Sequence, residues 1–268
     1  MLSADQRAAL QFYANAGVDT VEAESPGGIW NWKAASPRRV PAQQPAPAPQ
    51  APAPTASVSA GEALSAAEAL AATASDLEML VSTIAAFEGC PLREGARGPV
   101  VYDGVLGADV LIVGEAPGRE EDRLGKPFVG RSGQLLDRML ASIGLARAPG
   151  EEQRPVCITN VVYWRPPGNR NPTSAELAVC MPFARRFIAL TKPKLVLLAG
   201  KVPTEAFFPD VSSIIRSRGQ WREIETPDGA VPALPIFHPA FLLRQPAQKR
   251  WAWRDLLSAK AKLNDPLP

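Results

Sequence analysis

The stretch VLIVGEAPG, residues 110–118, joins four consecutive apolar residues to a turn rich in glycine and proline. A short apolar run bounded by such a turn is typical of a strand that is buried on both faces, as in a parallel sheet. A strand that ends in Gly-x-x-Pro-Gly turns sharply and can offer backbone amides to a ligand. This stretch therefore predicts the first strand of an α/β fold and the first segment of a candidate site.

Apolar strands and amphipathic helices alternate on the C-terminal side of this stretch. Strands are predicted at 110–115, 156–162, 194–200 and 232–237, with helices at about 131–144, 174–190, 202–208 and 246–263. The alternation predicts a three-layer α/β/α fold with a central, mostly parallel four-stranded sheet. In that architecture ligands bind at the carboxyl ends of the strands, and a polar segment follows each predicted strand here.

The composition changes twice on the N-terminal side. Residues 3–16 have apolar positions at helical spacing, whereas 37–61 are mostly Pro, Ala, Gln and Ser, which favours an extended polyproline II linker. A second helical stretch is predicted over about 63–87. We therefore divide the chain into an N-terminal helical extension at 1–36, a linker at 37–61 and a main domain at 62–268.

Charge and composition limit the function classes. Residues 1–87 carry four Lys/Arg and eight Asp/Glu, a net −4, which leaves 25 basic and 19 acidic residues, a net +6, for 88–268. This imbalance permits contact with a polyanion. No apolar run approaches the roughly 18 residues of a membrane span, so no membrane role is expected. Three cysteines and no recognisable export signal indicate a reducing, cytoplasmic setting.

The segment after the first strand carries several motifs in series. It reads GEAPGREED at 114–122, GKPFVG at 125–130 and GQLLD at 133–137. An acidic cluster alone is most often a solvated loop, but this series closely resembles motif A of the family 4 uracil-DNA glycosylases. Further segments follow in that family's order, namely Asn160, RPPGNRNP at 165–172, Ala-Gly at 199–200 and HPAFLLR at 238–244.

The resemblance covers about 88–264 and implies an enzyme of base excision repair. Such an enzyme flips uracil out of DNA and hydrolyses its N-glycosidic bond, which leaves an abasic site. The main domain would then be the glycosylase domain, acting as a monomer on uracil-containing DNA. Two alternatives remain: a glycosylase for another deaminated base such as hypoxanthine or xanthine, and a damaged-DNA-binding module without catalysis. The N-terminal helix on its tether favours, as a separate hypothesis, a protein partner.

The resemblance implies three uracil-binding residues, Ala116, Phe128 and Asn160. Phe128 would stack on the flipped base, although an ordinary core phenylalanine is the plainer interpretation. The Asn160 carboxamide offers both a donor and an acceptor, which match O4 and N3–H of uracil but not the opposite pattern of cytosine. A turn-capping role is the structural alternative for Asn160.

The HPAFLLR segment supplies further expected roles. His238 is the only histidine in the chain and matches the family's histidine, which hydrogen-bonds O2 of the leaving base. That bond strengthens as negative charge develops on uracil, and a neutral imidazole suffices for it. Leu242 or Leu243 is the expected wedge into the minor groove. Arg244 and Arg170 are the expected DNA contacts.

The residue that activates water is left open between two acids. Some uracil glycosylases have an aspartate early in motif A, but the corresponding residue here is Ala116. Glu115 lies in the same turn, and Glu121 matches an acidic residue that family 4 keeps in its pocket. An oxocarbenium-like sugar needs little nucleophile activation, so both carboxylates remain candidates.

The sequence departs from family 4 at the cysteines. Those enzymes hold a [4Fe–4S] cluster on four cysteines, but the corresponding residues here are Phe87, Cys90, Trp164 and Cys180. Cys157 lies inside a predicted strand and cannot substitute. Two thiolates cannot hold a cubane cluster, so we expect no metal and no cofactor. We also expect the rings of Phe87 and Trp164 to pack with the two cysteines in the space of the cluster.

Overall fold

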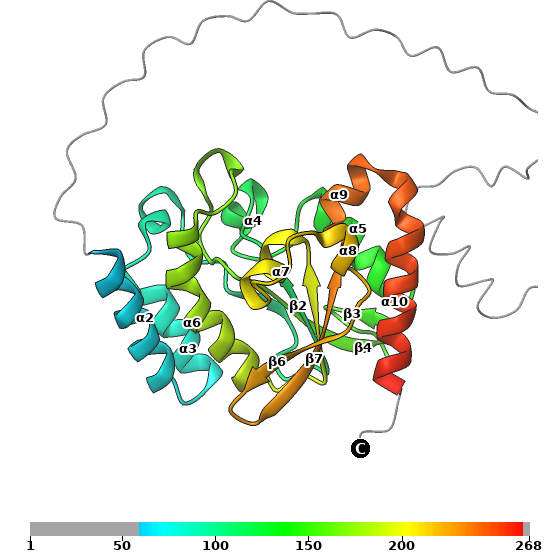
Figure 1. Cartoon of the computed structure of the whole chain (residues 1–268), viewed down its shortest axis with the longest axis horizontal. Helices are drawn as coiled ribbons and strands as arrows, with labels where there is room; N and C mark the ends of the chain where they lie inside the picture. The colour runs from blue at the N-terminus through cyan, green and yellow to red at the C-terminus, as the bar shows by residue number, and fades with distance from the viewer. Residues whose placement is uncertain (1–58, 265–268) are drawn as a thin grey trace, which may run out of the picture.

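The computed structural model describes residues 59–264, and a seven-stranded sheet runs through the middle of the fold (Figure 1). Its order is β1-β4-β2-β5-β7-β6, with β3 beside β4. The four inner strands are all parallel: β4 (Arg154–Asn160), β2 (Val110–Gly114), β5 (Leu195–Ala199) and β7 (Gly229–Ile236). These are the four strands that the sequence predicts, so the α/β class with a mostly parallel sheet is confirmed.

Three further strands make the sheet larger than predicted. They are β1 (Tyr102–Gly104), β3 (Leu145–Ala146) and β6 (Arg222–Thr226). β1 and β6 pair antiparallel at the two edges, whereas β3 runs parallel to the start of β4. The sequence gives little signal for them, because β1 and β3 are very short and β6 buries only Ile224 among polar neighbours.

Helices cover both faces of the sheet (Figure 1). One face carries α2 (Ala60–Thr73), α3 (Leu77–Ala86) and α6 (Ser174–Thr191); the other carries α5 (Arg131–Ala141) and α10 (Lys249–Asn264). The apolar residues of β2 divide between two cores. Leu111 and Val113 pack under α2, α3 and α6, whereas Val110 and Ile112 pack under α5 and α10. A strand buried on both faces is therefore apolar at every position.

Short helices occupy the connections. They are α4 (Arg119–Leu124), α7 (Lys201–Phe207), α8 (Ile214–Ser217) and α9 (Pro239–Arg244), with 3-10 turns η1 (Pro91–Gly95), η2 (Pro167–Asn169) and η3 (Pro246–Gln248). α4, α7 and α9 directly follow the carboxyl ends of β2, β5 and β7. The polar segments of the sequence thus meet at one edge of the sheet.

The single helix predicted over 63–87 is two helices. α2 begins at Ala60, where Ser59 and Glu62 form a capping box, and α3 begins after Asp76, whose side chain accepts a hydrogen bond from Met79 N at 2.8 Å. The cap at Asp76 ends one helix and starts the next. The predicted boundary at 61/62 therefore falls inside the first turn of α2.

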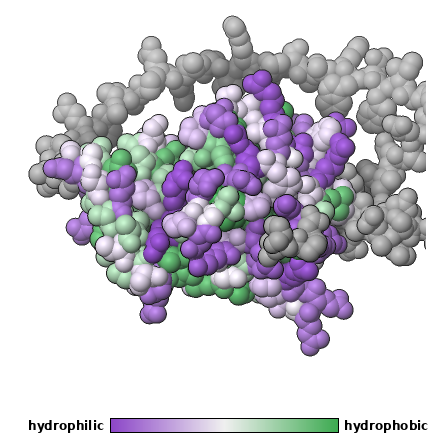
Figure 2. All heavy atoms as spheres, turned by 60° about the horizontal axis from the view of Figure 1, so that its bottom comes forward, coloured by the Kyte–Doolittle hydropathy of each residue, from purple (hydrophilic) through white to green (hydrophobic). Residues whose placement is uncertain are grey.

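The predictions for the helix at 3–16 and for most of the linker lie outside the described residues. Within 59–264, no helix is long and apolar enough to cross a membrane. Figure 2 shows a face of the molecule on which hydrophilic side chains predominate. Exposed apolar side chains include Leu70 of α2 and Met79 of α3.

Candidate active site

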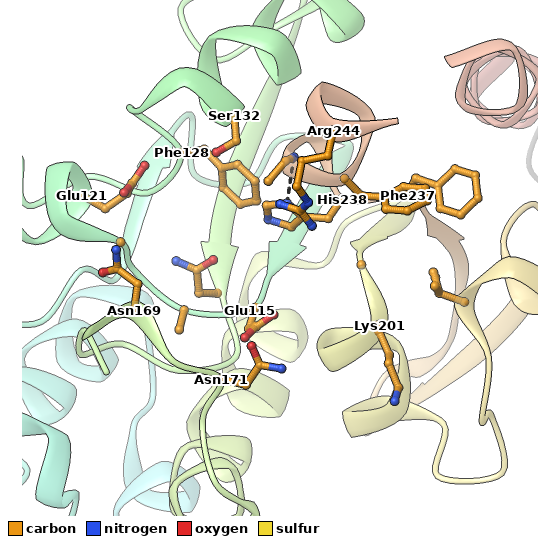
Figure 3. A pocket seen from close by; sticks show the side chains of 17 residues that line it. Glu115, Glu121, Phe128, Ser132, Asn169, Asn171, Lys201, Phe237, His238 and Arg244 are labelled. Atoms are coloured by element: carbon orange, nitrogen blue, oxygen red, sulfur yellow. Dashed lines mark hydrogen bonds between the residues drawn. The ribbon is translucent and has the colours of Figure 1, made fainter. Parts of the chain in front are cut away.

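A pocket of about 640 Å³ opens at the carboxyl ends of the inner strands (Figure 3). Seven of the residues singled out in the sequence line it, and they come from five separate segments: Glu115, Ala116, Glu121, Phe128, Asn160, His238 and Arg244. Arg170, Leu242 and Leu243 are not among the lining residues. The fold therefore brings together the base-binding and catalytic candidates, but only one of the four residues expected to contact DNA.

Asn160 is the last residue of β4 and lies beside Gly114, the last residue of β2. It is 2% exposed, yet within the described part of the chain its carboxamide has no hydrogen-bond partner. A side chain at position 114 would overlap both the Asn160 carboxamide and the Phe128 ring. The glycine that ends β2 therefore lets these two groups approach the same point of the pocket.

Phe128 forms the apolar wall of the pocket. Its ring is buried and stacks on the His238 imidazole, with a centroid distance of 5.4 Å and an interplanar angle of 28°. Its backbone is left-handed, with φ at 53°, a conformation that is uncommon for a large side chain. The ring lines the pocket on one side and packs against the core under α5 on the other.

His238 caps the N-terminus of α9, and this contact fixes its tautomer. Its Nδ1 accepts a hydrogen bond from Ala240 N at 3.1 Å, which is drawn as a dashed line in Figure 3. Burial, assisted by the positive charge of Arg244, lowers the pKa of His238 to about 4. The imidazole is therefore neutral at pH 7 with its proton on Nε2, which leaves an N–H donor for a ligand.

Gly200 directly follows β5 and explains the glycine of the Ala-Gly pair at 199–200. Its φ is +108°, and a Cβ atom there would lie only 3.0 Å from the Cβ of His238. The glycine thus satisfies a backbone conformation that other residues avoid and leaves space for the imidazole.

The two acidic candidates have different surroundings. Burial raises the pKa of Glu115, and its carboxylate has no hydrogen-bond partner among the described residues. Glu121 instead accepts hydrogen bonds on Oε1 from Val129 N at 3.0 Å and Gly130 N at 2.9 Å. The desolvated, unpaired carboxylate of Glu115 suits proton transfer. The carboxylate of Glu121 is bound to two backbone amides and has a structural role in this loop.

The structure corrects part of the expected DNA surface. The segment after His238 forms helix α9, which buries Leu242 completely in the core under α5 and α10. Leu242 cannot act as a wedge in this conformation, whereas Leu243 is only half-buried and Arg244 is exposed. Arg170 binds Glu176 through two hydrogen bonds of 2.8 and 2.7 Å, so its guanidinium is already paired.

Several lining residues were not singled out in the sequence: Ser132, Asn169, Asn171, Lys201, Phe237 and Phe241. Asn169 and Asn171 belong to RPPGNRNP, and Lys201 follows the Ala-Gly pair, so these motifs could have indicated them. Phe237 and Phe241 form an aromatic pair with a centroid distance of 4.9 Å. Nothing in the apolar pattern distinguishes them from core residues.

The expected packing of Phe87, Cys90, Trp164 and Cys180 in one apolar core is confirmed. Phe87, Cys90, Trp164 and Cys180 are all buried in one core, and the rings of Phe87 and Trp164 have centroids 6.5 Å apart. Among the described residues, no three His, Cys, Asp or Glu side chains gather as metal ligands. Two thiols flanked by large rings do not fit a [4Fe–4S] cluster.

Comparison with known proteins agrees with this geometry. The chain matches the model of the uracil DNA glycosylase superfamily over residues 102–258 and belongs to that superfamily. It is 33% identical to a type-4 uracil-DNA glycosylase of Pyrobaculum aerophilum, over 68% of this chain and 91% of that protein. A type-4 enzyme of Thermotoga maritima is 34% identical, over 69% of this chain and 93% of that protein. One of Archaeoglobus fulgidus is 36% identical, over 63% and 84%. Type 4 is thus the branch of the superfamily that these relatives share.

Proposed function

We propose that this protein is a uracil-DNA glycosylase that hydrolyses the N-glycosidic bond of deoxyuridine in DNA. The observation that carries the proposal is the carboxamide of Asn160, which lines a pocket walled by Phe128 and has no hydrogen-bond partner among the described residues. An amide that faces a pocket with both its donor and its acceptor unused can form two hydrogen bonds to a ligand. Uracil does so, because it presents an acceptor at O4 next to a donor at N3.

The pocket residues then divide the chemistry. Phe128 stacks on the flipped base, and Ala116 leaves room beside it. The C1′–N1 bond breaks with its electron pair moving to uracil, and His238 donates its Nε2–H to O2 as negative charge develops there. Water adds to the oxocarbenium-like C1′ and passes a proton to Glu115. The uracil anion takes up a proton from solvent and Glu115 returns the proton of the water to solvent, so that the net reaction adds one water across the C1′–N1 bond.

The DNA surface follows from the same geometry. Arg244 lies exposed at the rim of the pocket, where it can bind a phosphate. Of Leu242 and Leu243, Leu243 is the residue that enters the minor groove as a wedge. Arg170 supports DNA binding by fixing the loop that carries Asn169 and Asn171, through its bonds to Glu176. The protein acts on DNA as a monomer and needs no cofactor.

The test uses labelled oligonucleotides that carry uracil, hypoxanthine or xanthine, treated with alkali after incubation to reveal abasic sites. We expect strand cleavage with uracil and strong loss of it in Asn160→Asp, because a carboxylate repels O4. Asn264→Asp, at the exposed end of α10 and outside the pocket, is the matched control and should retain activity. Preferred cleavage at another base, or binding without cleavage, would replace this function with one of its two rivals.

His238 is tested separately by comparing activity with affinity. We expect His238→Ala to reduce the excision rate more than DNA affinity, because its hydrogen bond forms mainly in the transition state. Equal losses in both would show that His238 only positions DNA.

A further inference from the structure

The backbone that carries Phe128 is held from two sides. A left-handed phenylalanine persists only where its surroundings fix it. Two charged side chains that reach this loop from opposite directions provide the contacts. One of them, Arg147, lies outside the pocket lining and has no role in the reaction described above.

Arg147 binds the carbonyl side of the loop. Its NH1 donates to Pro127 O at 2.9 Å and its NH2 donates to Phe128 O at 2.8 Å. The same guanidinium pairs with Asp103 at 3.0 Å and with Asp137 at 2.8 Å. Its side chain is only 14% exposed. Arg147 directly follows β3, so these bonds connect the loop to the sheet, to β1 and to α5.

Glu121 binds the amide side of the same loop through Val129 N and Gly130 N. The peptide that follows Phe128 is therefore fixed at its carbonyl by Arg147 and at its amide by Glu121. Gly133 permits this arrangement, because any side chain there would overlap the Phe128 carbonyl. Each contact acts on the backbone, so the Phe128 ring remains free to face the pocket.

We propose that Arg147 is a positioning residue for base binding, which holds the Phe128 ring in stacking geometry by binding the two carbonyls of its loop. Glu121 completes this clamp from the other side. The inference depends on the proposed function, in which Phe128 stacks on the flipped uracil. Small displacements of a binding group can lower rates by about 100-fold, so the effect should be large enough to measure.

The test is a double-mutant cycle on the single-turnover rate of uracil excision. We expect Arg147→Gln and Phe128→Ala each to lower the rate by about 10- to 100-fold. The double variant should be no slower than Phe128→Ala, because Arg147 acts through that ring. DNA affinity should stay unchanged in Arg147→Gln, because this side chain is largely buried and lies outside the pocket. Arg147→Lys, which keeps one donor group and the charge, should recover part of the rate.

Arg186→Gln is the matched control, because Arg186 also donates to a carbonyl, that of Ala74, but between α2 and α6. Its effect should be additive with Phe128→Ala. If Arg147→Gln does not fold, Arg147→Lys replaces it in the double-mutant cycle. If the wild type excises uracil and the rate losses of Arg147→Gln and Phe128→Ala are additive, the role of Arg147 is overturned and the proposed function stands. A wild-type protein without uracil excision would overturn the proposed function and the clamp together.

Discussion

His238 and Glu115 show how burial in one pocket can prepare two opposite roles. Desolvation disfavours the charged form of each group, so the imidazole stays neutral and the carboxylic acid becomes a stronger base once ionised. The neutral imidazole donates a hydrogen bond to the leaving base, and the carboxylate accepts a proton from water. These two groups are the ones that the reaction uses most directly.

The single histidine makes its protonation directly measurable. We expect ¹⁵N NMR to show one neutral Nε2–H imidazole down to about pH 5, with a midpoint near the pKa of about 4. The uracil excision rate should therefore show no step near pH 6.5. Because the folded-state pKa is lowered, stability should decrease as the pH falls from about 6.5 to 4. His238→Gln should lose this component of the decrease in urea unfolding. A histidine titration near 6.5 would contradict the assignment.

We expect the Glu115 carboxylate to lower the stability of the folded protein while it supports uracil excision. Its pKa is raised, so above that pKa the folded state holds an unfavourable buried charge that Glu115→Gln removes. At neutral pH we expect the variant to melt at a higher temperature and to excise uracil about 10- to 100-fold more slowly. Glu120→Gln, on the exposed side of α4, should change neither property. Unchanged excision in Glu115→Gln would remove it as the base.

Motifs in the sequence could identify the pocket side chains but not the contacts that place them. Asn160 ends a buried strand, Glu115 and His238 follow two others, and parallel strands bring such residues to one edge. Arg147 binds backbone carbonyls about 20 residues away in the chain, which no local pattern reveals. The choice between Leu242 and Leu243 depended on the rotation of α9, and the sequence does not fix that rotation.

The packing around Trp164 joins two elements of the fold. Trp164, in the segment after β4, contacts Phe87 at the end of α3, so α3 and the active-site strand share a core. The side-chain polar atoms Tyr163 OH and Trp164 Nε1 are buried there without hydrogen-bond partners. This core therefore packs the aromatic rings closely but leaves two buried polar atoms without hydrogen bonds.

Removal of the Trp164 ring should destabilise the domain strongly. We expect Trp164→Ala to lower the free energy of unfolding by about 3–5 kcal/mol through the cavity it leaves. Trp164→Phe should cost much less, since it keeps an aromatic ring and removes a donor without a partner. Chemical denaturation measures both, and metal analysis of the wild type should find no stoichiometric iron. Brown, iron-containing protein would contradict this account.

The inner strands could be predicted because burial on both faces makes them apolar throughout, as in β2 and β5. The edge strand β6 could not be predicted, because only Ile224 is buried and its neighbours Arg222, Glu223 and Glu225 are charged. The break between α2 and α3 was also missed. Ala74 and Ser75 continue a helical composition, and only the side-chain cap of Asp76 separates the two helices.

At the scale of the whole molecule, the described domain contains every element of the proposed site. We expect a chain that begins at Ser59 to excise uracil from short oligonucleotides within about twofold of the full-length rate. The four basic and four acidic residues of 1–58 cancel, so their removal should also leave the salt dependence of DNA binding nearly unchanged. The comparison uses matched enzyme concentrations at two salt concentrations. A large loss of activity would assign a DNA-binding role to these residues.

The aromatic packing beside Cys90 and Cys180 has a consequence for the living cell. We expect a repair enzyme whose core closes with Phe87 and Trp164 to require no iron and no machinery to deliver it. The thiols of Cys90 and Cys180 are both buried, which shields them from oxidants in solution. Uracil repair by this protein should therefore continue during iron starvation and oxidative stress, when cytosine deamination still continues and cluster-dependent enzymes lose activity.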